Sequence, residues 1–554
     1  MASTVSTFSI PAADEGGAAD YAVQDIDHLG LVAGMVDELG LVELIDALVP
    51  QDRRQRKLSV GLLVKAMILN GLGFIQRVLY LMPRFFQDKP LERLLGPGVL
   101  AEHLNDDALG RALDAIYRYG PTELFAPLAA QAVKRLGLAC RTGHLDATSV
   151  HTDGRPGDGE EPEVVRITQG YSRDHRPDLG QVVAQLICEN QAGIPVFMKS
   201  LSGNSNDQAD FRATVSAHAG QLKADVGLER LVADSALYTE DTLRELDGFG
   251  WISRVPETLG LARELTLAVA GDLAGSPEEL AFRSLCVTYG GIRQRWLVVH
   301  TRAARQRAGK TLRKRHLDQG EAELKAFAHL QRTPFACAAD AEAALDAFRK
   351  RQKLTTVCDA HIFARPRYTG QGRPARGRVP DAHQYFVQGG LASRIDLHYQ
   401  ALDRKSCFIV ATNELDPQAL PDAQVIELYK KDQQKVERGF RFLKDPLFAA
   451  STLFLKTPQR IMALLMVMTL CLLVYAAIEW RVRQALQLSQ QSLPDQKGKA
   501  TQRPTARWVF QCFSGIRLLK VMGVQTLVLG INQHHRAVLD LLGNRYVELY
   551  ANSA

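Results

Sequence analysis

The chain of 554 residues is too long for one ordinary core and predicts about two to four domains. Hydrophobic residues make up 46% and charged residues 23%, a globular composition that excludes fibrous and wholly disordered classes. The net charge is only +6, but Arg293 to Arg315 holds nine Lys or Arg and no acid, and a second basic stretch runs from Arg349 to Arg378. Such local positive fields suit a polyanion partner, with a solvated basic surface as the alternative.

Eight cysteines are scattered along the chain without a CxxC pair. This spacing argues against a zinc site and a disulfide framework, and is typical of the reduced cytoplasm. The N-terminus, MASTVSTFSIPAADEGGAAD, lacks the basic and apolar regions of a secretory signal. We therefore expect a disordered tail over residues 1–24 and a cytoplasmic location.

Residues 25–140 have the apolar spacing of helices, as in LVAGMVDELGLVELIDAL. In HLNDDALGRALDAIYRYG, Asn105 is expected to cap a helix that has acids in its first turn and stops at Gly120. We predict a helical N-terminal domain, for which DNA-end binding is a plausible role.

The pattern changes at Arg141. HLDATSVHTDG, QVVAQLICEN and IPVFMKSLSG read as strands, the last two around turn residues Asn190 to Gly193. NDQADFRATVSAHAGQLKAD follows as a helix, and LERLVADSALY as a strand that ends in a helix start. Three strands, a helix and a further strand are the opening order of a ribonuclease H-like sheet.

The second half interrupts and then resumes this order. Short strands such as RQRWLVVHT and two basic helical stretches predict an insertion, after which SCFIVATNE reads as a buried strand and residues 422–445 as a long amphipathic helix. WVFQCFSGIRLLKVM and LDLLGNRYVELY both look helical. The predicted fold class is α/β, a ribonuclease H-like core with a β-rich, basic insertion domain: core 141–253, insertion 254–404, core 405–487 and C-terminal helical region 488–554.

The segment from Ile461 to Ile478 is apolar and long enough to be a membrane span. A helix buried on most sides of a large α/β domain has the same composition. Basic residues flank both ends, so charge gives no orientation, and no second span exists in the sequence. We favour the buried core helix and expect no membrane partner; a membrane anchor is the alternative.

Three acids stand where the predicted topology would bring them together. Asp146 lies in the first strand, Asp234 closes the fourth strand 88 residues later, and Glu437 follows on the long helix after a further 203 residues. Carboxylates from adjacent strands and a facing helix supply the hard oxygen ligands that Mg²⁺ prefers. Two such ions can activate a nucleophile and stabilise the leaving oxygen at phosphorus. For any one acid alone, a turn or cap role would be the simpler interpretation.

The strings around these acids carry a resemblance to a known family. HLDATSVHTDG, GYSRDHRPDLGQVVAQL, LVADSALYT and VERGFRFLKDPLF together resemble DDE transposases of bacterial insertion sequences, in the branch with a β-rich insertion before the catalytic Glu. Within that branch, the chain is most similar to the group named after insertion sequence sixteen-thirty-four. The resemblance implies that Asp146, Asp234 and Glu437 are the catalytic, metal-binding triad, holding two Mg²⁺ (or Mn²⁺) ions.

The resemblance also brings a signature in which Tyr, Arg, Glu and Lys share the last catalytic helix. Lys444 keeps the family's spacing from Glu437, two turns along one helix face, where its ammonium can meet a DNA phosphate. Tyr429 lies eight positions before Glu437, one more than the pattern expects, and Asp432 occupies the place of the signature Arg. Arg438 or Arg441 could supply the missing phosphate contact.

Other candidates are weaker. His175, Arg176 and Asp178 in GYSRDHRPDLGQ look typical of the family, and His144 shares a strand face with Asp146, where a core histidine is the simpler interpretation. Related transposases stack a flipped base on an aromatic residue of the insertion, which makes Trp296 a candidate DNA contact. The alternative is a tryptophan that faces the core of the sheet.

The implied activity is metal-dependent cleavage at the ends of a mobile element and strand transfer into target DNA, in a bacterial cytoplasm at the nucleoid. The partners would be the terminal inverted repeats and the target, bound by a homodimer because two ends must be paired. In the branch with the β-rich insertion, the element is often freed through a DNA hairpin. The sequence does not decide between this route and another route of cleavage. The alternatives are a ribonuclease H-fold nuclease without strand transfer and an inactive DNA-binding relative.

Overall fold

The computed structural model describes most of the chain in two compact units. The first comprises Met1–Trp251 with Ile426–Ala554, and the second Ile252–Val425. The described residues are 21–51, 57–74, 79–152, 164–170, 178–246, 248–369, 372–373, 375–432, 452–453, 457–521 and 525–553.

The first half of unit 1 is helical, as predicted for residues 25–140. The Asn105 side chain accepts a hydrogen bond from the backbone N–H of Ala108 at 3.0 Å, and Gly120 ends the helix with φ of 102°, so both predicted boundaries are confirmed. The α-helices are α1 (Leu29–Glu38), α2 (Leu41–Leu48), α3 (Val60–Leu72), α4 (Met82–Phe86), α5 (Leu91–Leu95), α6 (Asp106–Tyr119) and α7 (Pro121–Leu136).

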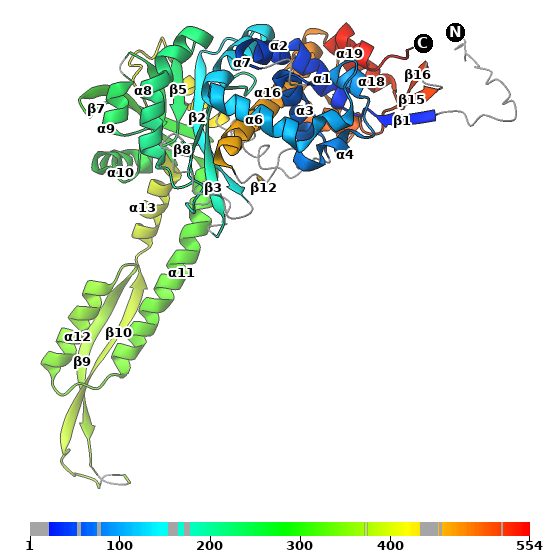
Figure 1. Cartoon of the computed structure of the whole chain (residues 1–554). Coiled ribbons are helices and arrows are strands. Elements are labelled where there is room, and N and C mark those ends of the chain that lie inside the picture. Colours follow the sequence, from blue (N-terminus) through cyan, green and yellow to red (C-terminus); the bar gives the residue numbers. More distant parts are fainter. Residues whose placement is uncertain are drawn as a thin grey trace. The chain divides into compact units, whose positions relative to one another are not determined.

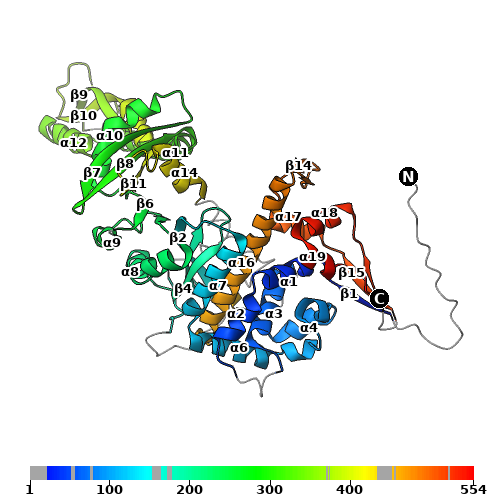
Figure 2. The same cartoon turned by 90° about the horizontal axis from the view of Figure 1, so that it is seen from above.

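A 31-residue helix, α16 (Pro458–Leu488), runs among these helices and packs against α1, α3, α6 and α7 (Figures 1 and 2). It is long and apolar enough to cross a membrane, yet 83% of its most apolar window is buried inside the protein. Arg460 pairs with Asp114 on α6 at 2.7 Å, and Arg481 pairs with Glu38 on α1 at 2.8 Å. This burial agrees with the core-helix interpretation of Ile461–Ile478.

The sheet of unit 1 has the predicted order of elements: three strands, a helix and a strand. Its strands lie in the order β4-β3-β2-β5, and a short strand, β12 (Thr452–Leu453), pairs with the far end of β2. Gly193, with φ of 76°, lies in the predicted turn between β3 and β4. The elements are β2 (Thr142–Thr152), β3 (Gly180–Glu189), β4 (Pro195–Ser202), α8 (Asp207–Val226) and β5 (Arg230–Ala233).

The two ends of the chain form a separate three-stranded sheet, in which β1 (Tyr21–Asp25) pairs with β15 (Arg517–Val521), and β15 pairs with β16 (Gln525–Leu529). The predicted disordered tail is therefore wrong for residues 21–24. The helical prediction for the C-terminal region is wrong at β15. The partner of β1 lies almost 500 residues away in the sequence, whereas β15 is the middle strand of the sheet and pairs with both β1 and the nearby β16.

The C-terminal region is otherwise helical. α18 (Gln533–Leu542) and α19 (Asn544–Leu549) are separated at Gly543, which has φ of 107°. α17 (Ala506–Cys512) precedes β15. The predicted helical run LDLLGNRYVELY is thus two helices that meet at a glycine.

Unit 2 combines a sheet with long helices. Residues Ile252–Arg254 of β6 (Gly250–Arg254) pair with β11 (Cys407–Thr412), which pairs with β8 (Ile292–Thr301), and β8 pairs with β7 (Leu280–Tyr289). The strand predicted from SCFIVATNE is β11, and it joins this sheet. The other elements are α10 (Gly260–Ala274), α11 (Arg302–Arg332), α12 (Ala338–Arg351), β9 (Thr355–Arg367), β10 (Ala382–Ser393) and α13 (Ile395–Ser406).

One buried carboxylate ties the far end of α11 to the start of β9. Glu323, 6% exposed, accepts hydrogen bonds from the backbone N–H groups of Lys353 (3.0 Å) and Thr355 (3.0 Å) and from the Thr355 hydroxyl (2.6 Å). Burial alone would raise the pKa of Glu323, but the hydrogen bonds outweigh it and hold the pKa below its usual range. The charged carboxylate therefore stabilises the fold of unit 2.

We expect Glu323→Ala to lower the free energy of unfolding by about 1–3 kcal/mol at neutral pH, because it leaves buried N–H donors without an acceptor. Since the folded pKa is depressed, this contribution is present above the unfolded pKa and is lost as pH falls through the folded pKa. Denaturation curves of both proteins at several pH values should converge in acid. Glu321→Ala, which removes an exposed partner of Lys325, is the control; an equal effect there would contradict the prediction.

Candidate active site

Asp146 and Asp234 lie on neighbouring parallel strands of unit 1. β2 pairs with β5 so that His144 faces Val232 and Leu145 faces Ala233. One position further along the same register are Asp146, within β2, and Asp234, the first residue after β5. Both side chains are partly exposed. The two predicted aspartates are thus brought together from positions 88 residues apart in the sequence.

The loop after Asp234 is held by its own hydrogen bonds. The Asp234 carboxylate accepts from the backbone N–H of Ala236 at 2.9 Å, and the side chain of Leu237 is fully buried. Thr239 then caps α9 (Glu240–Glu245), accepting from the N–H of Thr242 at 3.3 Å. The helix predicted to start directly after the strand begins only at Glu240, because residues 235–239 form this turn.

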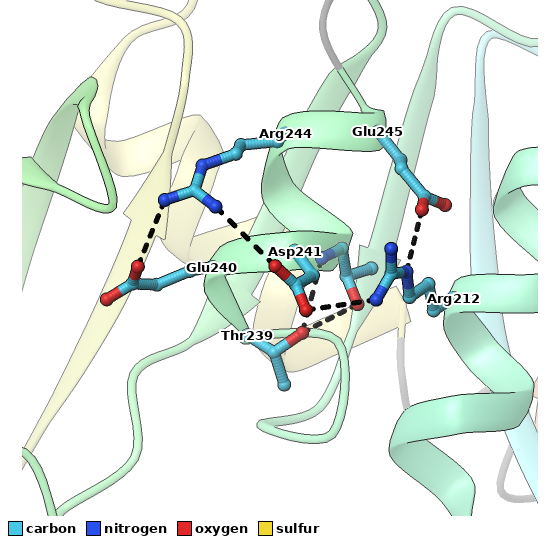
Figure 3. Close-up of polar contacts among 7 residues, drawn as sticks. Arg212, Thr239, Glu240, Asp241, Arg244 and Glu245 are labelled. Atoms are coloured by element: carbon cyan, nitrogen blue, oxygen red, sulfur yellow. Dashed lines mark hydrogen bonds and ion pairs between the residues drawn. The ribbon is translucent and has the colours of Figure 1, made fainter.

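A network of ion pairs joins α9 to α8 (Figure 3). Arg212 of α8 contacts Glu245 at 2.6 Å and Asp241 at 2.9 Å, and Arg244 joins Asp241 to Glu240. These side chains are mostly exposed, so each pair adds little stability. Their effect is to hold in place the helix that follows the Asp234 loop.

The surroundings of Asp146 favour oxygen ligands for a metal ion. Cys188 lies beside His144 on β3, and burial raises the pKa of its thiol far above the ordinary value, with further increases from the charges of Glu189 and Asp146. Burial therefore favours the protonated form of this thiol, which is a weak metal ligand. The remaining donors are carboxylate oxygens, which fit Mg²⁺ or Mn²⁺. His144 itself is buried, 3% exposed, in agreement with a core histidine.

Glu437 lies outside the described residues, but the chain on both sides of it is placed. Before it, the π-helical turn Leu428–Asp432 packs against β5, the strand that precedes Asp234. After it, Thr452 and Leu453 of β12 pair in parallel with His151 and Thr152 at the end of β2. The segment that carries Glu437 is therefore bounded by contacts with β5, just before Asp234, and with β2, five to six positions beyond Asp146.

Within the described residues, no group of three or more His, Cys, Asp or Glu side chains is arranged to hold a metal ion. Asp146 and Asp234 make up two of the three predicted ligands, and Glu437 is outside that part of the chain. Arg438, Arg441 and Lys444 lie outside it as well, as do His175 and Arg176.

Tyr429 is described, and it lies within a departure from the predicted helix. α14 covers only Asp422–Glu427 and continues as the π-helical turn Leu428–Asp432. Tyr429 is buried, with 8% of its surface exposed. The amphipathic pattern of residues 422–445 does not show such a turn, because a single inserted residue changes the spacing only locally.

Trp296 lies in the core of unit 2. It is fully buried in β8, and its indole N–H donates to the Gln294 side chain at 3.0 Å. This placement agrees with the core-facing alternative, because an enclosed indole has no face on which a base could stack. Base stacking on Trp296 would require its side chain to leave the core of unit 2.

Arg295 is a structural residue that the sequence analysis missed. It belongs to the first basic run, yet its side chain is 4% exposed. Its guanidinium donates to the carbonyl oxygen of Leu420 at 2.5 Å and pairs with Asp422 at 3.3 Å. These two contacts fix the start of α14, from which the chain continues toward Glu437. Arg293 and Arg295 share one face of the strand, so alternation does not separate them; Arg293 lies next to the exposed start of β8, whereas the strand is buried from Gln294 onward.

We expect Arg295→Met to lower the free energy of unfolding by about 2–4 kcal/mol, because it removes one partner of a largely buried ion pair. Arg293→Met is the matched control near the exposed start of the same strand and should change the stability by less than about 0.5 kcal/mol. Chemical denaturation measures both. Equal stabilities of the two variants would show that the Arg295 contacts do not hold α14.

Comparison with known proteins identifies the family of the chain. Residues 141–474 match the family model described as the transposase DDE domain, which spans Asp146, Asp234 and Glu437. Because the match covers more than half of the chain, the protein belongs to the DDE transposase family. Members of this family bind DNA, catalyse phosphoryl transfer and generally use divalent metal ions. Residues 21–130 match a domain of unknown function (DUF4277).

Other comparisons add little. No curated protein matches the chain. A solved piggyBac transposase synaptic complex with hairpin DNA is similar to it with a TM-score of 0.35 and 9% sequence identity, covering 88% of this chain and 79% of that one. A likeness at this score is too weak to support an argument, so the family assignment depends on the match to residues 141–474.

Proposed function

We propose that this chain is the transposase of a bacterial insertion sequence, which cuts DNA at the terminal inverted repeats of its element and joins the freed ends to target DNA. The observation that carries the proposal is the pairing of β2 with β5, which sets Asp146 next to Asp234, together with the anchoring of the Glu437 segment at both ends on these strands. The motif strings around the acids favour the group named after insertion sequence sixteen-thirty-four.

Asp146, Asp234 and Glu437 would hold two Mg²⁺ or Mn²⁺ ions. A divalent cation bound there supplies charge stabilisation for the oxygens that attack and leave the phosphorus atom. The chain's own contribution is to hold the carboxylates: the hydrogen bond from Ala236 fixes Asp234, and the N–H of Ala147 donates to Asp146 at 2.7 Å. Ligands fixed before the cation binds lose less freedom when it does.

The proposed reaction has two stages. In the first, a water oxygen forms a bond to phosphorus at the element end, and the bond to the 3′-oxygen breaks to leave a 3′-hydroxyl. In the second, that hydroxyl attacks a phosphodiester of the target, so that one phosphodiester forms as another breaks. Because the number of phosphodiesters is conserved in the second stage, joining needs no nucleotide cofactor. A homodimer would hold the two element ends.

Lys444 and either Arg438 or Arg441 are proposed to contact the DNA backbone beside the triad, on the strength of the sequence signature. Lys444 follows Glu437 by seven positions, which is two helical turns. A carboxylate on the metal and an ammonium on a phosphate can therefore share one helix face.

The π-helical turn at Leu428–Asp432 can compensate for the extra residue between Tyr429 and Glu437 in the signature. In a regular α-helix, eight positions would rotate Tyr429 about 80° from the face of Glu437, whereas the seven of the family pattern would rotate it by only about 20°. A π-turn takes up one extra residue. The turn at Leu428–Asp432 lies where this chain has one residue more than the pattern. We therefore propose that Tyr429 shares the face of Glu437.

Deletion of Lys431 should convert the π-turn into a regular turn and preserve DNA cleavage to within about tenfold, because Tyr429 and Glu437 would then be seven positions apart. A single-residue deletion in a regular helix would rotate every later side chain by about 100°. Insertion of one alanine after Lys431 is the control and should abolish cleavage. Loss of cleavage on deletion would overturn the proposed placement of Tyr429.

The central test uses the wild-type chain and the variants Asp146→Ala, Asp234→Ala and Glu437→Ala on labelled DNA that carries the element ends. We expect each variant to lose metal-dependent cleavage by at least about 10³-fold and to keep its DNA affinity within about threefold, because metal ligands are removed and phosphate contacts are not. Full cleavage by any one variant would reject its place in the triad.

Asp225→Ala, an exposed carboxylate on α8, is the control and should cleave like the wild type. A second measurement supplies DNA with a pre-formed 3′-hydroxyl end and a target plasmid. Joined product from the wild type supports a transposase. Cleavage without any joining would instead support a ribonuclease H-fold nuclease, and DNA binding without cleavage would support an inactive relative.

A further inference from the structure

The β9–β10 hairpin of unit 2 extends well beyond the helices that support it. β9 and β10 pair along the hairpin with one irregularity between Gln388 and Gly390, and the hairpin continues past α12 to its turn (Figure 1). Near its base it packs on a small apolar core formed by Phe327 of α11, Ala341 and Leu345 of α12, and Val387 of β10. The Gln331 side chain donates to the carbonyl oxygen of Gly389 at 2.8 Å and ties the hairpin to α11.

The face of the hairpin opposite this core carries a stacked arrangement. Phe363 and Phe386 are directly paired across the strands, with ring centroids 5.8 Å apart. The guanidinium of Arg365 lies over both rings, 5.6 Å from Phe363 and 5.2 Å from Phe386. This cation–π contact holds Arg365 on an exposed face, and no carboxylate of the described residues forms an ion pair with it.

The outer part of the hairpin is strongly and unequally charged. Between Arg365 and Asp381 there are five arginines and one acid. This acid, Asp381, has its partners within the turn region. Its carboxylate pairs with Arg378 at 3.1 Å and accepts a hydrogen bond from the N–H of Thr369 at 2.6 Å. These contacts hold the pKa of Asp381 below its usual range, so it stays charged and committed to Arg378.

The three remaining arginines of the turn region, Arg367, Arg373 and Arg376, are exposed. None of them forms an ion pair with a carboxylate in the part of the chain that the structure describes. By contrast, Arg349 and Lys325 in the same unit are paired with nearby acids. The outer hairpin is therefore a two-stranded ribbon, exposed on both faces, whose positive charge is not neutralised by the described protein.

A ribbon of this kind is matched to double-stranded DNA. A two-stranded β-ribbon fits the major groove, and guanidinium groups pair with phosphate oxygens through two parallel hydrogen bonds. An isolated ribbon is only marginally stable in water, and binding along a groove would provide contacts that the protein itself does not supply. Because the one acid of the outer hairpin is already paired with Arg378, the exposed surface is positively charged. An acidic polymer complements such a surface, and a basic or apolar partner does not.

We infer that the outer β9–β10 hairpin is a DNA-binding element that lies on duplex DNA. Arg367, Arg373 and Arg376 contact backbone phosphates. The rings of Phe363 and Phe386 keep Arg365 in position on the same hairpin. The inference deepens the proposed function, because it assigns to unit 2 a contact with the DNA that the triad is proposed to cut.

The test measures the affinity of the full chain for a labelled duplex at several salt concentrations. For the triple variant Arg367→Gln, Arg373→Gln, Arg376→Gln, the slope of log affinity against log salt should fall by about 2 to 3, since each phosphate contact contributes about 0.9. Affinity near 0.1 M salt should fall on the order of 10²-fold. The corresponding triple substitution by Lys keeps the charge and should retain the slope.

The matched control removes the same charge from ion-paired residues of unit 2, by Lys325→Gln, Arg349→Gln and Arg394→Gln. Its slope should stay within about 0.5 of the wild type. An unchanged slope in the hairpin variant, or an equal fall in the control, would overturn the inference. A hairpin variant that binds the duplex like the wild type but no longer binds polyglutamate would also overturn the inference. That result would indicate an acidic protein as the partner.

Cleavage by the wild-type chain keeps this test separate from that of the proposed function. If the wild type cleaves element ends and the hairpin variant keeps its slope, only the hairpin inference fails. If the slope falls but the wild type neither cleaves nor joins DNA, the hairpin contact stands and the proposed function fails.

Discussion

The parallel pairing of β2 with β5 is the constraint on which the candidate site depends. Parallel strands present equivalent positions at the same level, so a register fixed by Leu145 and Ala233 also fixes the next residues, Asp146 and Asp234. A shift of the register by one residue would turn one carboxylate to the opposite face. The site is therefore as precise as the apolar packing that sets this register, which the buried Leu145 and Leu231 provide.

The helix α16 has a comparable role for unit 1 as a whole. Its apolar surface packs against the N-terminal helices and β4, and its ion pairs reach α1 and α6. The sequence divides these elements into separate regions, residues 25–140 and 405–487, but their side chains form one core. A helix that is apolar on all sides needs neighbours on all sides, and here the neighbours come from the beginning of the chain.

Sequence reasoning predicted the elements whose signals are local. The Asn105 cap, the stop at Gly120, the turn before Gly193 and the order of β2 to β5 all follow from nearby residues. It failed where a distant partner decides the outcome: β1 is a strand because it pairs with β15, almost 500 residues away.

For the site, the two aspartates could be predicted from their strand-end positions, and the structure places them together. The roles of Trp296 and Arg295 could not, because composition gives a basic and aromatic run without saying which side chains face inward. Both are buried in β8, while Arg293 on the same strand is exposed. The π-turn at Leu428–Asp432 was also invisible, since only the count against a family pattern indicates an extra residue.

The order in which the chain leaves the ribosome has a consequence for how it can fold. Unit 2 is one continuous stretch, Ile252–Val425, and all of it is synthesised before α16 exists. Unit 1 is discontinuous: its N-terminal helices must wait for α16, and β1 must wait for β15, which is synthesised after unit 2 and α16. During that interval the apolar faces that later receive α16 are uncovered, a state that favours aggregation and chaperone binding. The paired aspartates therefore belong to a unit that is completed only after all of unit 2 has been synthesised.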